Sequence, residues 1–182
     1  MNLIKTKLDG LVVLKPTVFK DNRGYFMESY NQKNINKLLG NVNFIQDNES
    51  ESSRGVLRGL HFQKEPFAQS KLVSVQKGKI LDMVVDIRKN SKYYGENFSI
   101  ELDDISNKHL FVPKGFAHGF IVLSKVARVS YKADNYYNPQ CEDGLNYNDL
   151  QLGIDWKIDE KSIITNEKDR NYSSFNSKVF FK

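Results

Sequence analysis

The stretch KLVSVQKGKILDMVVDI, Lys71 to Ile87, decides the fold class. It holds two runs rich in Val, Ile and Leu, and Gly78 with its flanking lysines separates them. Short apolar runs bounded by Gly and Lys are typical of β-strands, because a helix needs a longer stretch with helical periodicity. The stretch therefore predicts two consecutive strands. The apolar pair inside ILDMVVDI is also what a strand that bends between two sheets would show.

Similar runs lie on both sides of this stretch. They read GLVVLKP (10–16), FIQDN (44–48), NFSIELDD (97–104), KHLFVPKG (108–115), HGFIVLS (118–124) and ARVSYKAD (127–134). Their even spacing, with few helical patterns between them, predicts an all-β sandwich or barrel rather than alternating strands and helices.

Helical patterns are confined to two short segments. NQKNINKLLG (31–40) predicts a helix closed by Gly40, and a second helical segment is expected around NEKDRNY (166–172). The polar segment 138–156 predicts a loop with a short helical turn.

Length and composition indicate one ordinary globular domain over residues 1–182, with 40% hydrophobic and 27% charged residues and a net charge of +5. The charge is spread along the chain, so it suits an anionic small molecule and does not form the basic stripe typical of nucleic-acid binding. A single cysteine, Cys141, excludes an internal disulfide framework. No signal peptide or membrane-spanning run is recognisable, and we expect a soluble, cytoplasmic protein.

The stretch VLRGLHFQ (56–63) is the first candidate functional site. Arginine is rarely placed in an apolar strand without an anion or carboxylate to meet, so Arg58 beside His61 indicates a binding or catalytic role. In a regular strand these two side chains would lie on opposite faces, whereas a bulge at Gly59 could redirect one of them. Periodicity alone leaves both arrangements open.

A second histidine lies in FVPKGFAHGF (111–120), and a third opens the strand run at His109. Taken alone, His118 is best read as a buried, hydrogen-bonded core residue. Cupin metal sites use a His-x-His pair, and Leu60 and Phe62 flank His61 instead. A three-histidine site would have to recruit His109, so we expect no metal.

Several segments, in order, resemble the nucleotide-sugar 3,5-epimerase family, which is typified by dTDP-4-dehydrorhamnose 3,5-epimerases. They are DNRGYFMESY (21–30), QDNESESSRGVLRGLHFQKEPFAQSKLV (46–73), GKILDMVVDIRKNSKYYG (78–95), LFVPKGFAHGFIVLS (110–124), YKADNYYNPQCEDGLNYNDLQLGIDW (131–156) and NEKDR (166–170). The resemblance implies a double-stranded β-helix of the cupin or jelly-roll type, a homodimer, and chemistry without a metal or organic cofactor.

The resemblance also implies a reaction. The C–H bonds at C3 and C5 of a 4-keto sugar are acidified by the carbonyl, so epimerisation needs a base, an acid on the opposite face and stabilisation of the enolate. By similarity the catalytic residues are the base His61, its partner Asp169, the acid Tyr131, and Lys71 and His118 at the developing O4 charge. Residues similar to the family's substrate contacts are Arg23, Phe26, Glu28, Gln46, Asn48, Arg58, Tyr137, Glu142 and Lys168.

Departures from the family pattern leave the substrate open. Glu51 stands where the family often has arginine, and Tyr147 stands where tryptophan is common. We therefore expect 3,5-epimerisation of a dTDP-4-dehydro-6-deoxyglucose type of substrate, with a GDP-linked 4-keto heptose, or inversion at C3 or C5 alone, as alternatives. Tyr131 argues against the ketoisomerase relatives. A non-catalytic sugar-nucleotide-binding cupin and a metal-dependent cupin oxygenase are the readings from other classes.

Overall fold

The computed structural model describes residues 1–175 and 181, and nearly all of its regular structure is β. The elements in chain order are β1 (Asn2–Lys5), β2 (Val12–Lys15), β3 (Val18–Asp21), β4 (Gly24–Met27), α1 (Gln32–Leu39), β5 (Gln46–Ser53), β6 (Leu57–Gln63), β7 (Lys71–Lys77), β8 (Lys79–Asp86), β9 (Asn97–Asp103), β10 (His109–Val112), β11 (Phe116–Val122), β12 (Val126–Ala133), β13 (Glu142–Gly144), a 3₁₀ turn (Glu160–Ser162) and α2 (Glu167–Arg170).

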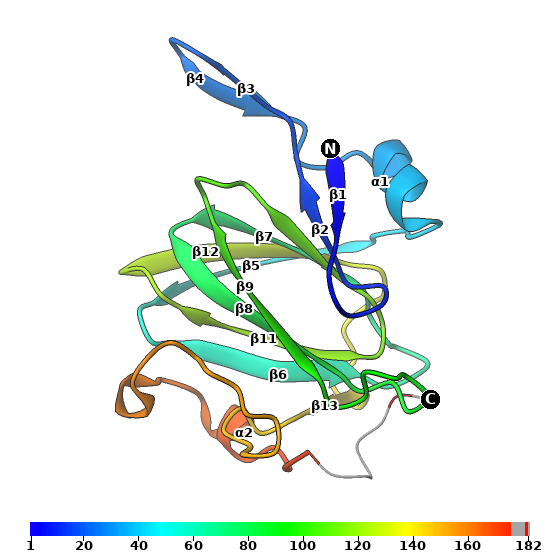
Figure 1. Cartoon of the computed structure of the whole chain (residues 1–182), viewed down its shortest axis with the longest axis vertical. Coiled ribbons are helices and arrows are strands. Elements are labelled where there is room, and N and C mark those ends of the chain that lie inside the picture. Colours follow the sequence, from blue (N-terminus) through cyan, green and yellow to red (C-terminus); the bar gives the residue numbers. More distant parts are fainter. Residues whose placement is uncertain (176–180, 182) are drawn as a thin grey trace.

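Two antiparallel sheets form a sandwich (Figure 1). The six-stranded sheet has the order β1-β2-β10-β7-β12-β5, and the five-stranded sheet has the order β13-β6-β11-β8-β9. Neighbouring strands in each sheet are mostly distant in sequence, which is the jelly-roll arrangement expected from the resemblance. The all-β prediction with short helical segments near each end is thus confirmed.

Three apolar clusters hold these layers together. The first lies between the two sheets and includes Val73, Val84 and Leu110. The second lies on the other face of the five-stranded sheet, where the segment around Leu152 and Trp156 covers it. The third packs α1 against the outer face of the six-stranded sheet. Each sheet is therefore apolar on both faces over much of its area, which explains runs such as VVLKP and HLFV that do not alternate cleanly.

Strand β8 shows this double burial most clearly. Ile80 and Val84 face the cluster between the sheets, while Leu81, Met83 and Val85 face the second cluster. All of its pairs, with β11 and β9, belong to one sheet. The interpretation of its apolar pair as a bend between sheets was wrong: the pair reflects apolar cover on both sides.

Most predicted elements are present. Helix α1 ends at Leu39 with Gly40 as its cap at φ 81°, as predicted, and α2 lies within the predicted C-terminal helical segment. Strand β5 continues through the polar QDNESESS, which the sequence pattern cut short at Asn48. The segment 138–156 contains strand β13 and turns but no helix, so the predicted helical turn there was wrong.

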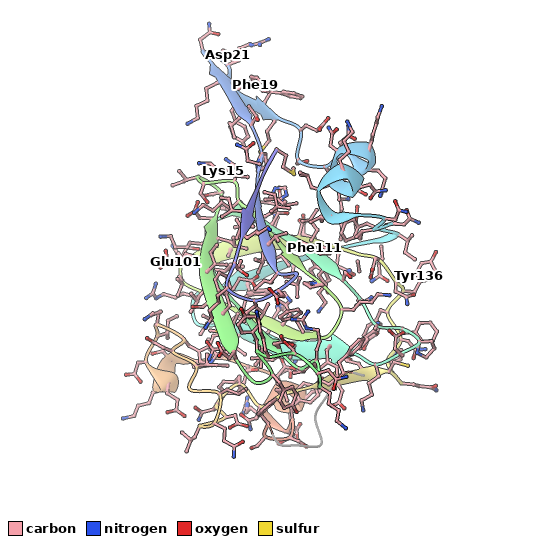
Figure 2. All side chains as sticks on the ribbon, turned by 45° about the vertical axis from the view of Figure 1, so that its right-hand side comes forward. Lys15, Phe19, Asp21, Glu101, Phe111 and Tyr136 are labelled. Atoms are coloured by element: carbon pink, nitrogen blue, oxygen red, sulfur yellow. The ribbon has the colours of Figure 1, made fainter. Side chains whose placement is uncertain are left out.

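The hairpin formed by β3 and β4 leaves the sandwich and extends away from it (Figure 1). Its aromatic side chains are exposed: Phe19 at 62%, Tyr25 at 58% and Phe26 at 69%. Figure 2 shows Phe19 and Asp21 at this end of the molecule, beyond the packed body. Separately, none of the helices in the described part of the chain combines the length and apolar character needed to cross a bilayer.

Candidate active site

A bulge in β6 decides where its polar side chains point. His61 pairs with His118 and Arg58 pairs with Phe120, so Gly59 and Leu60 together lie opposite Gly119 alone. The extra residue restores Arg58 and His61 to the same face, which a regular strand would not do. Of the two arrangements left open by the sequence, the structure has the bulged one.

Glycine is required on both strands at this crossing. Gly59 has a φ of 129°, and a Cβ built on it would lie 2.5 Å from the Cα of Gly119. A Cβ on Gly119 would lie 2.6 Å from the carbonyl oxygen of Arg58. The two backbones therefore approach more closely than any side chain allows.

Both side chains enter a cavity of about 410 Å³ between the two sheets, which we call the central cavity. The six-stranded sheet lines it from β5, β7 and β12, and the five-stranded sheet lines it from β6, β11 and β13. The lining residues predicted from the sequence are Asn48, Arg58, His61, Lys71, His118, Tyr131, Tyr137, Glu142 and Asp169. Residues that are 121 positions apart in the chain thus meet in one cavity.

Asp169 holds the imidazole of His61. Its Oδ1 lies 2.8 Å from His61 Nε2, and its Oδ2 accepts a 3.0 Å hydrogen bond from the amide of Gly59. Burial acts to raise the pKa of Asp169, but these two hydrogen bonds, together with the electrostatic attraction of His61 and Lys168, outweigh burial and hold the pKa below its usual value. The carboxylate is therefore charged and accepts a hydrogen bond from Nε2–H, so in the neutral imidazole Nδ1 carries the lone pair.

Helix α2 supplies this carboxylate. Asn166 caps the helix by accepting a 2.7 Å hydrogen bond from the amide of Asp169. The side chain of Asp169 then points into the protein and is only 1% exposed. The sequence NEKDR thus encodes both the cap and the buried acid, three positions apart on one turn.

His118 has its own carboxylate partner. Its Nε2 lies 3.0 and 3.1 Å from the two oxygens of Asp82 on the neighbouring strand β8, and both residues are buried. Asp82 was not among the predicted site residues. Its signal in the sequence is an acid inside the apolar run KILDMVVDI, because a buried charge needs a partner.

Tyr131 and Lys71 enter the central cavity from the opposite sheet. The ammonium of Lys71 lies 5.8 Å from the centre of the Tyr131 ring. Burial raises the pKa of Tyr131, and the charge of Glu142 adds to the effect. Burial lowers the pKa of Lys71 to about 8, although Asp82 and Glu142 oppose the shift. The phenol of Tyr131 is thus protonated near neutral pH. The amine of Lys71 is a cation near neutral pH and loses its proton at mildly alkaline pH.

Polar side chains at one end of the cavity are tied together. Glu142 accepts a 2.6 Å hydrogen bond from the hydroxyl of Tyr137 and forms an ion pair with Lys168. Gln46 accepts a 2.9 Å hydrogen bond from the amide of Tyr137. Gln46 and Lys168 therefore support lining residues without lining the cavity themselves.

The guanidinium of Arg58 is anchored to the wall of the cavity. Its Nε and Nη2 donate hydrogen bonds of 3.2 and 3.1 Å to the Ser52 hydroxyl. Ser52 and Asn166 are two further residues at the site that sequence reasoning missed, because short polar side chains in strands and loops carry little signal alone.

Three predicted substrate contacts lie elsewhere in the chain. Arg23 and Phe26 are on the protruding hairpin, where Arg23 is paired with Asp21 and Phe26 is exposed. Glu28 accepts hydrogen bonds from the side chains of Asn31 and Asn34 beside α1. The structure does not bring these three residues to the central cavity: the hairpin points away from the sandwich, and Glu28 lies beside α1.

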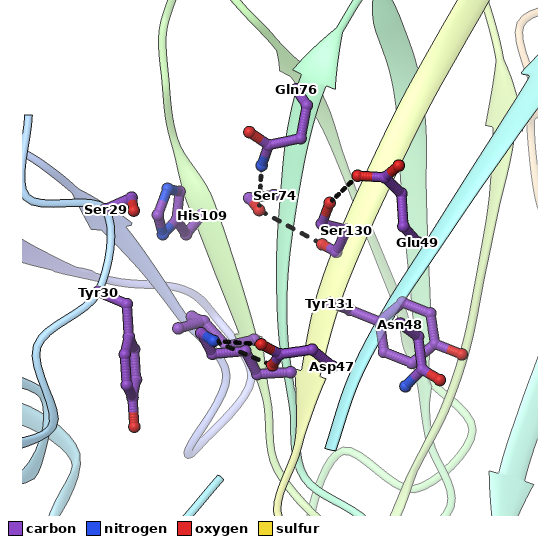
Figure 3. Close-up of a pocket in the computed structure, with 12 residues that line it drawn as sticks. Ser29, Tyr30, Asp47, Asn48, Glu49, Ser74, Gln76, His109, Ser130 and Tyr131 are labelled. Atoms are coloured by element: carbon purple, nitrogen blue, oxygen red, sulfur yellow. Dashed lines mark hydrogen bonds and ion pairs between the residues drawn. The ribbon is translucent and has the colours of Figure 1, made fainter. Parts of the chain in front are cut away.

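A second cavity of about 410 Å³ lies on the outer face of the six-stranded sheet (Figure 3). Its wall includes His109, Ser74 and Ser130, and an ion pair joins Lys132 to Asp47 there. Burial lowers the pKa of His109 to about 4. Leu110, the next residue on β10, faces the cluster between the sheets, so His109 points the other way and cannot join His61 and His118.

Within residues 1–175 and 181, no group of three or more His, Cys, Asp or Glu side chains is arranged to hold a metal ion.

Comparisons with known proteins place the chain in a family. A family model described as dTDP-4-dehydrorhamnose 3,5-epimerase matches residues 5–177. The epimerase of that name from Methanothermobacter thermautotrophicus is 48% identical over 93% of this chain and 91% of its own length. The one from Escherichia coli is 44% identical over 95% of this chain and 94% of its own length.

Solved structures agree. The crystal structure of a dTDP-4-dehydrorhamnose 3,5-epimerase from Elizabethkingia anophelis is 49% identical and has a TM-score of 0.94, with 99% of both chains covered. A 3,5-epimerase from Legionella pneumophila in complex with dTDP-4-keto-L-rhamnose is 39% identical and also has a TM-score of 0.94, covering 100% of this chain and 97% of the other.

Proposed function

Since the chain belongs to the dTDP-4-dehydrorhamnose 3,5-epimerase family, we propose that it inverts C3 and C5 of a dTDP-linked 4-keto-6-deoxy sugar through an enolate. The observation that carries the proposal is that His61 and Tyr131 enter one cavity from opposite sheets. A sugar ring between them would have a base on one face and an acid on the other. The bound ligand of the Legionella relative favours dTDP over the GDP-heptose alternative.

His61 is the base in this proposal. Its Nδ1 takes the proton from C3 or C5, and the electron pair of that C–H bond moves toward the C4 oxygen to give the enolate. The charge of Asp169 stabilises the imidazolium that forms and keeps the Nε2 proton in place. The buried hydrogen bond from the Gly59 amide fixes the Asp169 carboxylate in place, so that it does not follow movements of the His61 imidazole.

Lys71 and the His118–Asp82 pair face the developing O4 charge. An ammonium between the sheets is poorly solvated, so its attraction for an enolate oxygen is stronger than in water. His118 is held by a buried carboxylate and can present its ring to the same oxygen. These groups stabilise charge that is absent from the ground-state ketone, and so they lower the barrier.

Tyr131 returns the proton. Its pKa is raised by burial and by Glu142, so the phenol keeps its proton until a stronger base, the enolate, is formed. The proton moves from the hydroxyl to carbon on the face opposite His61, and the C4 carbonyl is restored. Inversion therefore needs both groups, whereas removal of the proton needs only His61.

We also propose that the working form is a cytoplasmic homodimer in which residues 1–182 make up one cupin domain per protomer. A two-stranded hairpin with exposed aromatic rings is only marginally stable in water, and exposed apolar groups of this kind mark contact surfaces. The hairpin of one protomer would reach the partner and supply Arg23 and Phe26 to the partner's cavity, and Glu28, which directly follows the hairpin, would join them. This places an arginine where a diphosphate could receive paired hydrogen bonds.

The acid and base roles predict different effects on proton exchange in D₂O. His61→Asn should lose both deuterium incorporation and epimerisation of a dTDP-4-keto-6-deoxy sugar by about 10²–10⁴-fold, the usual contribution of a general base. Tyr131→Phe should lose epimerisation by a similar factor and still exchange, because His61 can return deuterium to the same face.

NMR of the recovered sugar measures exchange and configuration together. His109→Asn and Tyr136→Phe are matched controls, since neither side chain lines the central cavity. Exchange that persists in folded His61→Asn would remove that residue as the base, and unchanged inversion in Tyr131→Phe would remove the phenol as the acid.

The lowered pKa of Lys71 predicts how kcat/KM changes at alkaline pH. The amine is charged below its pKa of about 8 and neutral above it, so kcat/KM should fall as pH rises through about 8. Arginine remains charged in this range, so Lys71→Arg should be slower but should lack the fall up to about pH 9.5. Initial rates across this range measure both, and a wild-type profile that stays level to pH 9.5 would contradict the role.

The shared-site proposal predicts complementation. His61→Asn and Arg23→Ala protomers should each be weakly active alone. A heterodimer would contain one intact site, with His61 from one protomer and Arg23 from the other. Because half of randomly mixed dimers are heterodimers, an equal mixture should recover about one quarter of wild-type activity. A monomer in sedimentation experiments, or no recovery after subunit exchange, would overturn the proposal.

A further inference from the structure

The ring of Tyr172 packs against the imidazole of His61. The two ring centres are 5.7 Å apart with planes inclined at 68°, which is an edge-to-face contact. Tyr172 is not among the residues that line the central cavity. The contact is therefore made from behind, on the protein side of His61 rather than the substrate side.

Backbone hydrogen bonds hold this tyrosine in place. After α2 ends, the amide of Asn146 donates a 3.0 Å bond to the carbonyl of Ser173. The adjacent Leu145 exchanges hydrogen bonds with Leu60 on β6, the strand that carries His61. These bonds connect the segment that carries Tyr172 to β6 through residues 145 and 146. Tyr172 therefore lies between helix α2, which supplies Asp169, and the strand that supplies His61.

Gly144 leaves the space that the ring occupies. It lies directly opposite His61 in the β13–β6 pairing. A Cβ at this position would lie 2.5 Å from Tyr172 Cε2 and 2.6 Å from the carbonyl oxygen of Leu60. The pairing of glycine with tyrosine therefore builds a close aromatic contact at the back of the imidazole.

A third contact on the imidazole has a physical purpose. The ring is fixed at Cβ and, near its far end, by the hydrogen bond from Nε2 to Asp169. These two points leave it free to roll about the line that joins them. Rolling would change the direction of the Nδ1 lone pair, which lies in the ring plane. A rigid aromatic ring packed against the imidazole at 68° opposes the roll.

We propose that Tyr172 is a positioning residue that fixes the plane of the His61 imidazole and so aims Nδ1 at the substrate carbon. The inference rests on the proposed function. The aromatic ring contacts His61, whereas the hydroxyl is directed elsewhere: no hydrogen bond joins it to His61 or Asp169 within the described residues, and its charged neighbour is Lys168. Burial also raises the pKa of Tyr172 to about 12, so the hydroxyl stays neutral.

The test compares substitutions that keep or remove the ring. Tyr172→Phe keeps it and should retain kcat within about twofold. Tyr172→Leu removes it and should lower kcat about 10- to 100-fold, the scale expected for a misaligned catalytic group, while KM changes less than about twofold. Tyr147→Leu is the matched control, because Tyr147 belongs to the same C-terminal cover of the five-stranded sheet and makes its contacts in the second cluster.

Crystal structures of the same variants measure the orientation of the imidazole directly. The plane of His61 should be rotated or disordered in Tyr172→Leu and unchanged in Tyr172→Phe and Tyr147→Leu. Full kcat with an unmoved imidazole in Tyr172→Leu would overturn the inference, and so would an equal loss of kcat in Tyr172→Phe. Absence of turnover by the wild-type protein would instead count against the proposed function, while the orientation of the imidazole still tests the role of Tyr172.

Discussion

The site depends on one buried carboxylate that serves two partners. Asp169 accepts a hydrogen bond from the backbone N–H of Gly59 with one oxygen and from the Nε2–H of His61 with the other. The first bond ties the carboxylate to the bulge in β6, and the second transmits that position to the imidazole. Because the carboxylate is almost fully buried, it depends on both hydrogen bonds, and a hydrogen bond to a charged group contributes about 1.5–3 kcal/mol. The base, its tautomer and the bulge are therefore one structural unit.

The same logic recurs across the central cavity. His118 is hydrogen-bonded to Asp82, and Arg58 is hydrogen-bonded to Ser52. Glu142 binds both Tyr137 and Lys168. His118, Tyr137 and Arg58 are each held by a hydrogen-bonded neighbour that is less exposed to solvent. Such preorganisation lets the groups stabilise charge as it develops without first having to reorient. Cover from the C-terminal segment, including Tyr172, completes the support behind β6.

The fold could be predicted from the sequence where burial alone decides the pattern. Runs such as KLVSVQKG and NFSIELDD became strands, and Gly40 ended α1, because local chemistry and tertiary packing agree there. The polar part of β5 was missed since it pairs with β12 through the backbone while its side chains are largely polar and exposed, with Arg128–Glu51 and Lys132–Asp47 ion pairs across the strands, so it has no apolar periodicity. Likewise β13, with three residues, is a strand only because β6 lies beside it.

The site could be predicted only in part. His61 and Arg58 stood out as polar groups in an apolar strand, but their common face depends on the Gly59 bulge, and His61 and Asp169 are 108 residues apart. Their meeting, and that of Asp82 with His118, is a property of the folded sheets. The roles of Tyr131 and Asp169 were expected from the family resemblance, not from spacing. Nothing local in the sequence indicates that Tyr172 reaches the imidazole.

The position of the proton on His61 tests this account most directly. Long-range ¹H–¹⁵N spectra near neutral pH distinguish the two imidazole nitrogens. The account predicts a proton on Nε2 and a bare Nδ1 in the wild-type protein. In Asp169→Asn the amide oxygen should keep the hydrogen bond from Gly59 and turn the NH₂ group toward Nε2, which moves the proton to Nδ1. A wild-type protein with the proton on Nδ1, or a tautomer unaffected by Asp169→Asn, would contradict it.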